Sequence, residues 1–273
     1  MSAEDLWIGC LRILESGDLA AKLAPIGDRG FDAPPPGRSL DAPRRGAGLE
    51  MSGGQAPLPR PASLGDAEAR ALCLARFAHH EIQAVELFAW ALLRWPGLPD
   101  PVLRGFARIL GEEQRHARGY LSRLAALGFQ FADFAPHSDY FWKHVPGIDR
   151  PEAFLAAVGL TLEQANLDFS LIYRDAFRAA GDEESARVCE EVHEDEIGHV
   201  SFAAESLRAL QPGGCEIDRY EQAVPFPLGA ARAKARRFDR RARERAGLGS
   251  AFIEHVRVAR SSQERASDPR EPT

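Results

Sequence analysis

Two Glu-x-x-His pairs are the residues of this sequence best suited to chemistry. Glu113 precedes His116, and Glu196 precedes His199. Residues three positions apart on a helix lie on the same face, so each pair can present a carboxylate and an imidazole to one metal ion. A single pair of this kind is common on helical surfaces. Two pairs, each with a further glutamate upstream, indicate a metal site.

The upstream glutamates lie at matching distances from the pairs. Glu81 precedes Glu113 by 32 residues, and Glu163 precedes Glu196 by 33. Both upstream glutamates fall on stripes of apolar residues with three- and four-residue spacing, where an isolated carboxylate is costly to bury. The two halves of this pattern therefore look like distant copies of one pair of helices.

Four glutamates and two histidines are the ligand set of a dinuclear iron or manganese centre inside a helical bundle. Four carboxylates offset the charge of two divalent ions, whereas an empty site would have to protonate or hydrate its acids. The competing interpretation is that these acids are solvated or ion-paired surface groups. The predicted ligands are Glu81, Glu113, His116, Glu163, Glu196 and His199.

A rival ligand set uses the pair Glu190 and His193 with Glu86 on the first helix. Glu190 lies only 8 residues into its predicted helix, whereas Glu163 lies 17 residues from the end of the preceding one. At 1.5 Å per residue, this is a mismatch of about 13 Å in height. We therefore prefer Glu196 and its histidine. We expect solvated side chains at Glu86, Glu112, Glu190, Glu191 and Glu194.

Four long helical segments must position the ligands, and proline, glycine and aspartate mark their ends. The short connections within the first and second pairs of segments predict antiparallel hairpins, while residues 129–148 are long enough to cross a bundle. Within each hairpin the two glutamates differ in height by only about 3 to 5 Å. We predict an all-α four-helix bundle with one long crossover, from segments 63–95, 101–128, 151–180 and 182–210.

Further segments flank the predicted bundle at residues 63–211. Residues 1–25 form a helix whose apolar side docks on the bundle, and residues 26–62 form a linker rich in proline and glycine. In the tail at 212–273, residues 232–245 carry eight basic and two acidic side chains, a local charge of +6. We favour a tail that neutralises the acidic bundle over one that binds an anionic substrate or RNA. The aromatic crossover either roofs a substrate pocket or seals the bundle.

Composition limits the class of protein. The 273 residues are 45% hydrophobic and 27% charged, enough apolar material for one main core, and the net charge of −6 argues against non-specific nucleic-acid binding. We expect no membrane span, because no uncharged stretch reaches about 18 residues. The acidic amino terminus and four cysteines without Cys-x-x-Cys spacing predict a cytoplasmic protein with reduced thiols.

Three stretches carry a family resemblance: HHEIQAVELFAWAL, GEEQRHA and HEDEIGHVSF. They resemble helices of the ferritin-like superfamily, which includes bacterioferritin, rubrerythrin and the oxygen-activating di-iron oxidases. The whole chain more closely resembles a bacterial ferritin-like family catalogued as a domain of unknown function, whose tail has a motif like FDRRARERAGL, here residues 238–248. The resemblance implies a ferritin-like bundle. It also implies that Glu113 and Glu163 bridge the metals, and that Glu81 and Glu196 are terminal ligands beside His116 and His199.

Tyr120 follows His116 by four residues, which resembles the position of the radical tyrosine in the small subunit of class I ribonucleotide reductase. A core aromatic is the favoured alternative for Tyr120. The extra cysteine pairs of rubrerythrin are missing from this sequence.

We expect a protein that binds two iron ions and uses dioxygen to oxidise a small organic substrate, with Glu113, Glu163 and Tyr120 as catalytic candidates. Manganese or a mixed manganese–iron pair is the alternative metal content. The first alternative function is a ferroxidase or a peroxide-detoxifying protein. The second is a metal-stabilised scaffold whose basic tail binds RNA or a protein. Nucleic acid is the less favoured partner, and a homo-oligomer remains an open alternative.

Overall fold

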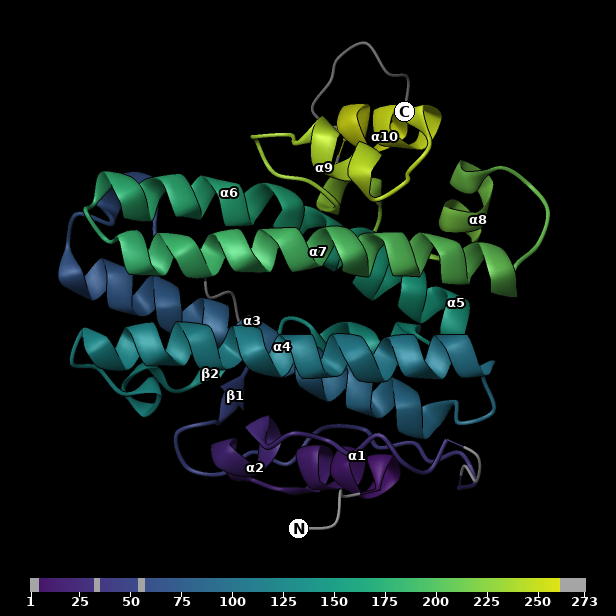
Figure 1. Cartoon of the computed structure of the whole chain (residues 1–273), viewed down its shortest axis with the longest axis horizontal. Coiled ribbons are helices and arrows are strands. Elements are labelled where there is room, and N and C mark those ends of the chain that lie inside the picture. Colours follow the sequence, from purple (N-terminus) through teal and green to yellow (C-terminus); the bar gives the residue numbers. More distant parts are fainter. Residues whose placement is uncertain (1–4, 32–34, 54–56, 261–273) are drawn as a thin grey trace. The chain divides into compact units, whose positions relative to one another are not determined.

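The computed structural model describes residues 5–31, 35–53 and 57–260. It is an all-α helical bundle with two very short strands, which confirms the predicted fold class (Figure 1). The α-helices are α1 (Leu6–Glu15), α2 (Leu19–Leu23), α3 (Ala67–Arg94), α4 (Asp100–Ala126), α5 (Pro151–Phe154), α6 (Gln164–Ala179), α7 (Glu183–Leu210), α8 (Glu216–Ala223), α9 (Arg240–Arg245) and α10 (Ser250–Val258). The strands are β1 (Met51–Ser52) and β2 (His137–Ser138), which pair in parallel. Short 3₁₀ turns are η1 (Pro61–Ser63), η2 (Phe131–Phe134), η3 (Trp142–Gly147) and η5 (Ala230–Arg232), and a π-helix, η4, spans Leu155–Glu163.

The chain divides into two compact units. Unit 1 comprises residues 1–146 and 174–188, and unit 2 comprises residues 147–173 and 189–273. Helices α6 and α7 contribute residues to both units. In the three described ranges, no helix combines the length and the apolar character that a membrane span requires.

Local capping explains where the long helices begin and end. The Asp66 carboxylate accepts a hydrogen bond of 2.8 Å from the Ala69 backbone N–H, so α3 begins after Asp66, a few residues later than the predicted start at Ser63. Gly128 follows α4 with a φ of +87°, and Gly181 follows α6 with a φ of +76°. Glycine adopts this left-handed conformation without the steric cost of a Cβ atom, so both helices end close to their predicted positions.

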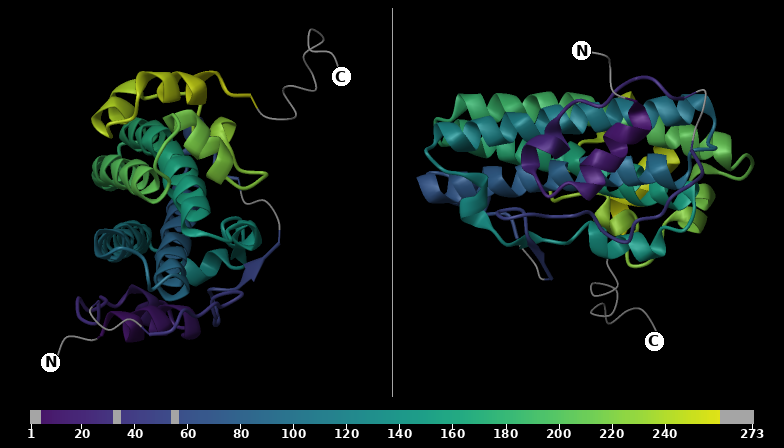
Figure 2. Two further views of the ribbon diagram at one scale, coloured as in Figure 1. Left: turned by 90° about the vertical axis from the view of Figure 1, so that its right-hand side faces the viewer. Right: turned by 90° about the horizontal axis from the view of Figure 1, so that it is seen from below.

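The prediction of one continuous amino-terminal helix is wrong. It is split into α1 and α2, because the Asp18 side chain caps the second piece by accepting from the backbone of Ala20 and Ala21. Gly17 lies in the break, where a Cβ atom would approach the backbone N of Gly46 to 3.0 Å. Helix α1 packs against α3 within unit 1, and its buried residues are mostly apolar (Figure 2).

The crossover lies along α3 in unit 1. The Phe141 backbone N–H donates to Oε1 of Gln83 at 3.1 Å, and the Trp142 indole donates to Oε2 of Glu86 at 3.0 Å. Nε2 of His79 lies 2.6 Å from the carbonyl oxygen of Ser138. Of the two expected roles, these contacts favour a segment that seals the flank of a helix.

Unit 2 departs from the predicted third helix. The expected continuous helix is replaced by α5, the π-helix η4 and α6. Within η4, the Thr161 hydroxyl donates to the Ala156 carbonyl at 2.8 Å, and a Cβ atom at Gly159 would collide with Ala203 of α7. π-Helical segments are rare and occur frequently at functional sites. Here the π-helix ends at Glu163, one of the predicted metal ligands.

Candidate metal-binding groups

Unit 1 brings together three of the predicted ligands. Helix α3 supplies Glu81, and α4 supplies Glu113 and His116. All three side chains are buried, and each offers a ligand atom within 4.8 Å of those of the other two. Nδ1 of His116 lies 3.6 Å from Oε2 of Glu113. This triad could hold a metal ion.

Unit 2 brings together the other three predicted ligands. The last residue of η4 is Glu163, and α7 supplies Glu196 and His199. Nδ1 of His199 lies 3.0 Å from Oε2 of Glu163 and 3.2 Å from Oε2 of Glu196. These side chains are also buried, with ligand atoms within 4.8 Å of one another. The unit 2 triad thus has the same composition as the unit 1 triad, two carboxylates and one imidazole.

Asn166 is a site residue that the sequence reasoning missed. Its Nδ2 donates a hydrogen bond of 2.9 Å to Oε1 of Glu196. The available signal was spacing, because Asn166 follows Glu163 by three residues and so lies on the same face of the chain. A side-chain amide in this position fixes the orientation of the Glu196 carboxylate.

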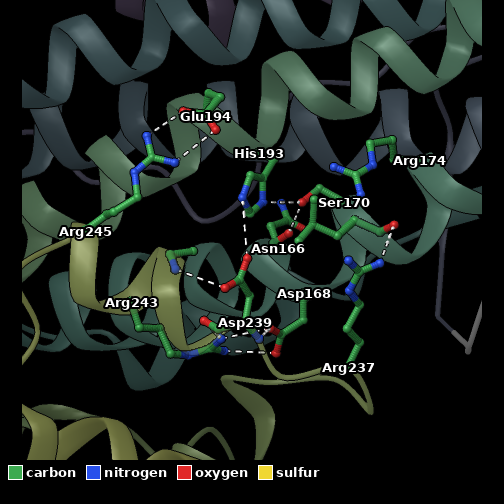
Figure 3. A network of polar contacts seen from close by, with 12 residues as sticks. Asn166, Asp168, Ser170, Arg174, His193, Glu194, Arg237, Asp239, Arg243 and Arg245 are labelled. Atoms are coloured by element: carbon green, nitrogen blue, oxygen red, sulfur yellow. Dashed lines mark hydrogen bonds and ion pairs between the residues drawn. The ribbon is translucent and has the colours of Figure 1, made fainter.

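A polar network continues from Asn166 toward the tail within unit 2 (Figure 3). The Ser170 hydroxyl donates to the backbone carbonyl of Asn166 at 2.5 Å and lies 3.1 Å from Nδ1 of His193. On the other side of its ring, His193 has Nε2 at 3.8 Å from Oδ2 of Asp239. The histidine of the rival Glu-x-x-His pair therefore contacts the tail and α6, which explains its burial.

The tail is anchored to α6 by a buried ion pair. Arg243 lies in the middle of the FDRRARERAGL motif, and its guanidinium binds both carboxylate oxygens of Asp168 (Figure 3). The backbone N–H groups of Ala235 and Asp239 donate to the same carboxylate at 2.9 and 2.7 Å. The two oxygens of Asp168 therefore hold the tail in place.

Other basic residues of the tail also have partners. Arg245 forms a two-point pair with Glu194 of α7, and Arg240 lies 3.4 Å from Glu254. Both contacts are on the surface. The Arg245 pair neutralises an acid of the bundle helix α7, as expected, whereas the Arg240 pair lies within the tail. Helices α8, α9 and α10 lie close to one another in unit 2 (Figure 2).

The prediction of a solvated side chain at Glu86 is wrong. It is fully buried in unit 1, where Oε1 lies 2.9 Å from Nζ of Lys22 and Oε2 lies 2.6 Å from Nη2 of Arg45. Burial lowers the pKa of Lys22 from its usual value, while the Glu86 carboxylate opposes that shift. Both cations come from the amino-terminal segment, so the periodicity of α3 gives no sign of them.

The histidines that precede Glu81 have packing roles. The ring of His79 stacks on His137 at 4.7 Å, and burial lowers the pKa of His79 well below its usual value. His80 stacks on Phe141 at 5.4 Å, and burial lowers its pKa to about 4. Both rings are therefore neutral at pH 7 and form part of the contact between α3 and the crossover.

Tyr120 is buried on α4 and stacks on Phe77 of α3, with ring centroids 5.2 Å apart. This contact agrees with the favoured alternative of a core aromatic. A redox role for Tyr120 stays a prediction.

Comparison with known proteins gives one finding about family. Searches of curated proteins and of solved structures returned no match. Residues 15–254 match a family described as "Protein of unknown function (DUF455)". Because the match covers most of the 273 residues, the chain belongs to the DUF455 family.

Proposed function

We propose that the protein binds two iron ions and uses dioxygen to oxidise a small organic substrate. The observation that carries this proposal is the pair of buried triads, each built from two glutamates and one histidine. The resemblance of the ligand-bearing stretches to the ferritin-like superfamily supports the same function. Manganese is the alternative metal for the same ligands.

The donor chemistry fits this metal content. Carboxylate oxygens and imidazole nitrogens together suit divalent iron and manganese, whereas thiolates would favour zinc or an iron–sulfur cluster. Burying four carboxylates is costly unless positive charge offsets them, and two divalent ions supply that charge. The triads therefore match two ions in both donor type and charge.

Each ligand then has a defined task. Glu81, Glu113 and His116 of unit 1 would hold metal, as would Glu163, Glu196 and His199 of unit 2. Bound iron would supply the electrons for dioxygen reduction. Asn166 would orient Glu196 through its hydrogen bond, as groups behind a ligand commonly do. The buried surroundings of the triads would limit the access of bulk water.

An anaerobic Fe(II) titration followed by exposure to air tests this proposal. We expect two irons per chain and an absorbance change that requires oxygen. Both should be lost in Glu113→Ala and Glu196→Ala. The matched controls Glu112→Ala and Glu191→Ala remove neighbouring acids outside the triads and should behave like the wild type. Fewer than one iron per chain in the wild type would contradict the proposal, as would equal binding by all four variants.

The same titration separates the alternatives. A ferroxidase would consume oxygen and release ferric iron without any organic substrate. A metal-stabilised scaffold would bind metal, show no reaction with oxygen and lose thermal stability in Glu113→Ala. The ion pairs of Arg243 and Arg245 give the tail an intramolecular role, which makes the RNA-binding alternative the least favoured.

A further inference from the structure

A pocket in unit 1 lies between α4 and residues 25–31, apart from the predicted metal ligands. It has a volume of about 380 Å³, within the range of small-molecule sites. Two side chains of α4 fix the chain that forms its wall. Gln114 donates to the carbonyls of Lys22 and Ala24 at 2.9 and 2.8 Å, and Arg118 donates to the carbonyl of Leu23 at 2.7 Å. The pocket is therefore formed before any ligand binds.

The floor of the pocket is one face of α4 with small residues in the middle and arginines at both ends. Ala107 and Gly111 lie between Arg104 on one side and Arg118 on the other, with Arg108 next to Ala107. Spacings of three, four and seven residues place these side chains on a common helical face. A ligand lying along this face would contact small residues at its centre and guanidinium groups at its ends.

Gly111 keeps the floor open. A Cβ atom at this position would meet no other atom within 4 Å, so packing within the protein does not require glycine. The backbone also has no need for it, because Gly111 is not among the glycines with positive φ. Glycine inside a helix reduces stability relative to alanine. Its presence here is explained if the space above it receives a ligand.

The charge of the pocket favours an anion. Its lining carries three arginines and one aspartate, Asp28, although the whole chain has a net charge of −6. Arg104 pairs with Asp100 and Arg108 pairs with Glu112, each at 2.7 Å. Arg118 has no carboxylate partner within the described part of the chain, so its charge is available to a ligand.

The apolar side chains of the pocket favour a ligand with an apolar or aromatic body. Pro25, Ile26 and Phe31 contribute to the wall. The guanidinium of Arg104 lies 4.4 Å from the centre of the Phe31 ring, which holds this ring in place as a flat surface. Guanidinium groups bind carboxylates and phosphates through paired hydrogen bonds.

We propose that this pocket binds a small organic anion with an apolar or aromatic body and a carboxylate or phosphate group. The anionic group lies against Arg118, and the body lies over Gly111 beside Phe31. This assignment is independent of the proposed iron chemistry.

Isothermal titration calorimetry with defined probes tests the proposal. Phenyl phosphate and phenylacetate carry both features, inorganic phosphate carries the charge alone, and benzyl alcohol carries the body alone. We expect phenyl phosphate, phenylacetate or both to bind at least tenfold more tightly than either partial probe. The probe that binds more tightly shows whether the pocket prefers a phosphate or a carboxylate.

Variants of the full-length chain locate the binding. Arg118→Gln should weaken binding of the preferred probe at least fivefold, and Gly111→Leu should abolish binding by filling the floor. Arg187→Gln changes an exposed arginine of α7 that pairs with Glu184, and it should bind like the wild type. Thermal unfolding of each variant checks that the fold is retained.

Two outcomes would overturn the proposal. One is the failure of both aromatic anions to bind the wild type at millimolar concentration. The other is binding that Gly111→Leu leaves unchanged, since Gly111→Leu removes the space without touching a charge or a wall contact.

Discussion

Arg243 of α9 and Asp168 of α6 form a fully buried two-point ion pair. Nη1 lies 2.8 Å from Oδ1, and Nη2 lies 3.0 Å from Oδ2. The same guanidinium donates to the carbonyls of Ala233 and Asp239 and stacks over the Phe238 ring at 3.9 Å. One arginine therefore holds the turn before α9 and fixes it to α6.

Arg243→Ala should strongly destabilise the protein. Removing one member of a buried pair leaves the other charge without its partner, at a cost of about 3 to 5 kcal/mol. The matched control is Arg245→Ala, which removes the half-exposed pair with Glu194 and should cost less than about 1 kcal/mol. Urea unfolding measures both values. Equal losses in the two variants would contradict a structural role for the buried pair.

Asn166→Ala should weaken iron binding without unfolding the chain. Its amide donates to Glu196, and loss of a group that orients a ligand typically costs about 10- to 100-fold in metal affinity. Gln211→Ala is the control, because it removes an exposed amide contact with Gln222 in the same unit. Anaerobic Fe(II) titration with circular dichroism checks both variants. If Asn166→Ala binds iron as tightly as the wild type, the amide does not orient the ligand.

Two helical glycines should respond to alanine in opposite directions. Gly111 faces open space, so Gly111→Ala should stabilise the protein by about 0.5 to 1 kcal/mol through lower chain entropy in the unfolded state. Gly159 faces Ala203, so Gly159→Ala overpacks the contact and should cost about 1 to 3 kcal/mol. The midpoint of urea unfolding gives both values. A gain in stability for Gly159→Ala would show that the π-helix can move away from Ala203 at little cost in free energy.

Acid should destabilise unit 1 through His137. Its ring stacks between His79 and Phe131, and burial lowers its pKa, with Arg45 adding to the effect and Glu50 opposing it. The folded chain therefore binds this proton less readily than the unfolded chain. The stability contributed by the neutral ring is complete above the usual pKa of 6.5 and is lost as the pH falls below it.

His137→Phe keeps the stack and removes the titrating group. The loss of stability below pH 6.5 should become shallower in this variant, and His79 and His80, whose pKa values burial also lowers, contribute to the part that stays. His255→Phe changes a half-exposed histidine that contacts Glu221 and serves as the control. Thermal unfolding between pH 7 and pH 5 makes the comparison. Identical pH profiles for wild type and His137→Phe would exclude His137 as the cause.

Local sequence signals predicted the long helices well. Their ends depend on residues that act within one turn, such as the Asp66 cap and the glycines at 128 and 181. The composition of each triad was also predictable, because three- and four-residue spacing determines which side chains share a helical face. That the two triads share metal ions stays a proposal.

Features that depend on distant contacts were not predictable. The π-helix replaces a regular helix where Gly159 packs against Ala203. Its mostly apolar sequence has no periodicity that distinguishes a π-helix from an α-helix. The solvated state expected for Glu86 was wrong because its cations lie 64 and 41 residues away in the chain. Asn166 was overlooked because its three-residue spacing from Glu163 indicates a shared helical face but does not identify Glu196, 30 residues away, as its partner.

The long sequence separation of the tail anchor has a consequence for biosynthesis. Arg243 follows its partner on α6 by 75 residues. At about 5 to 20 residues per second, the ribosome needs roughly 4 to 15 s to reach the arginine after it has made the aspartate. During that interval the nascent chain carries Asp168 without the arginine that pairs with it in the folded protein. The buried pair that anchors the tail to α6 therefore forms only after the FDRRARERAGL motif has been synthesised.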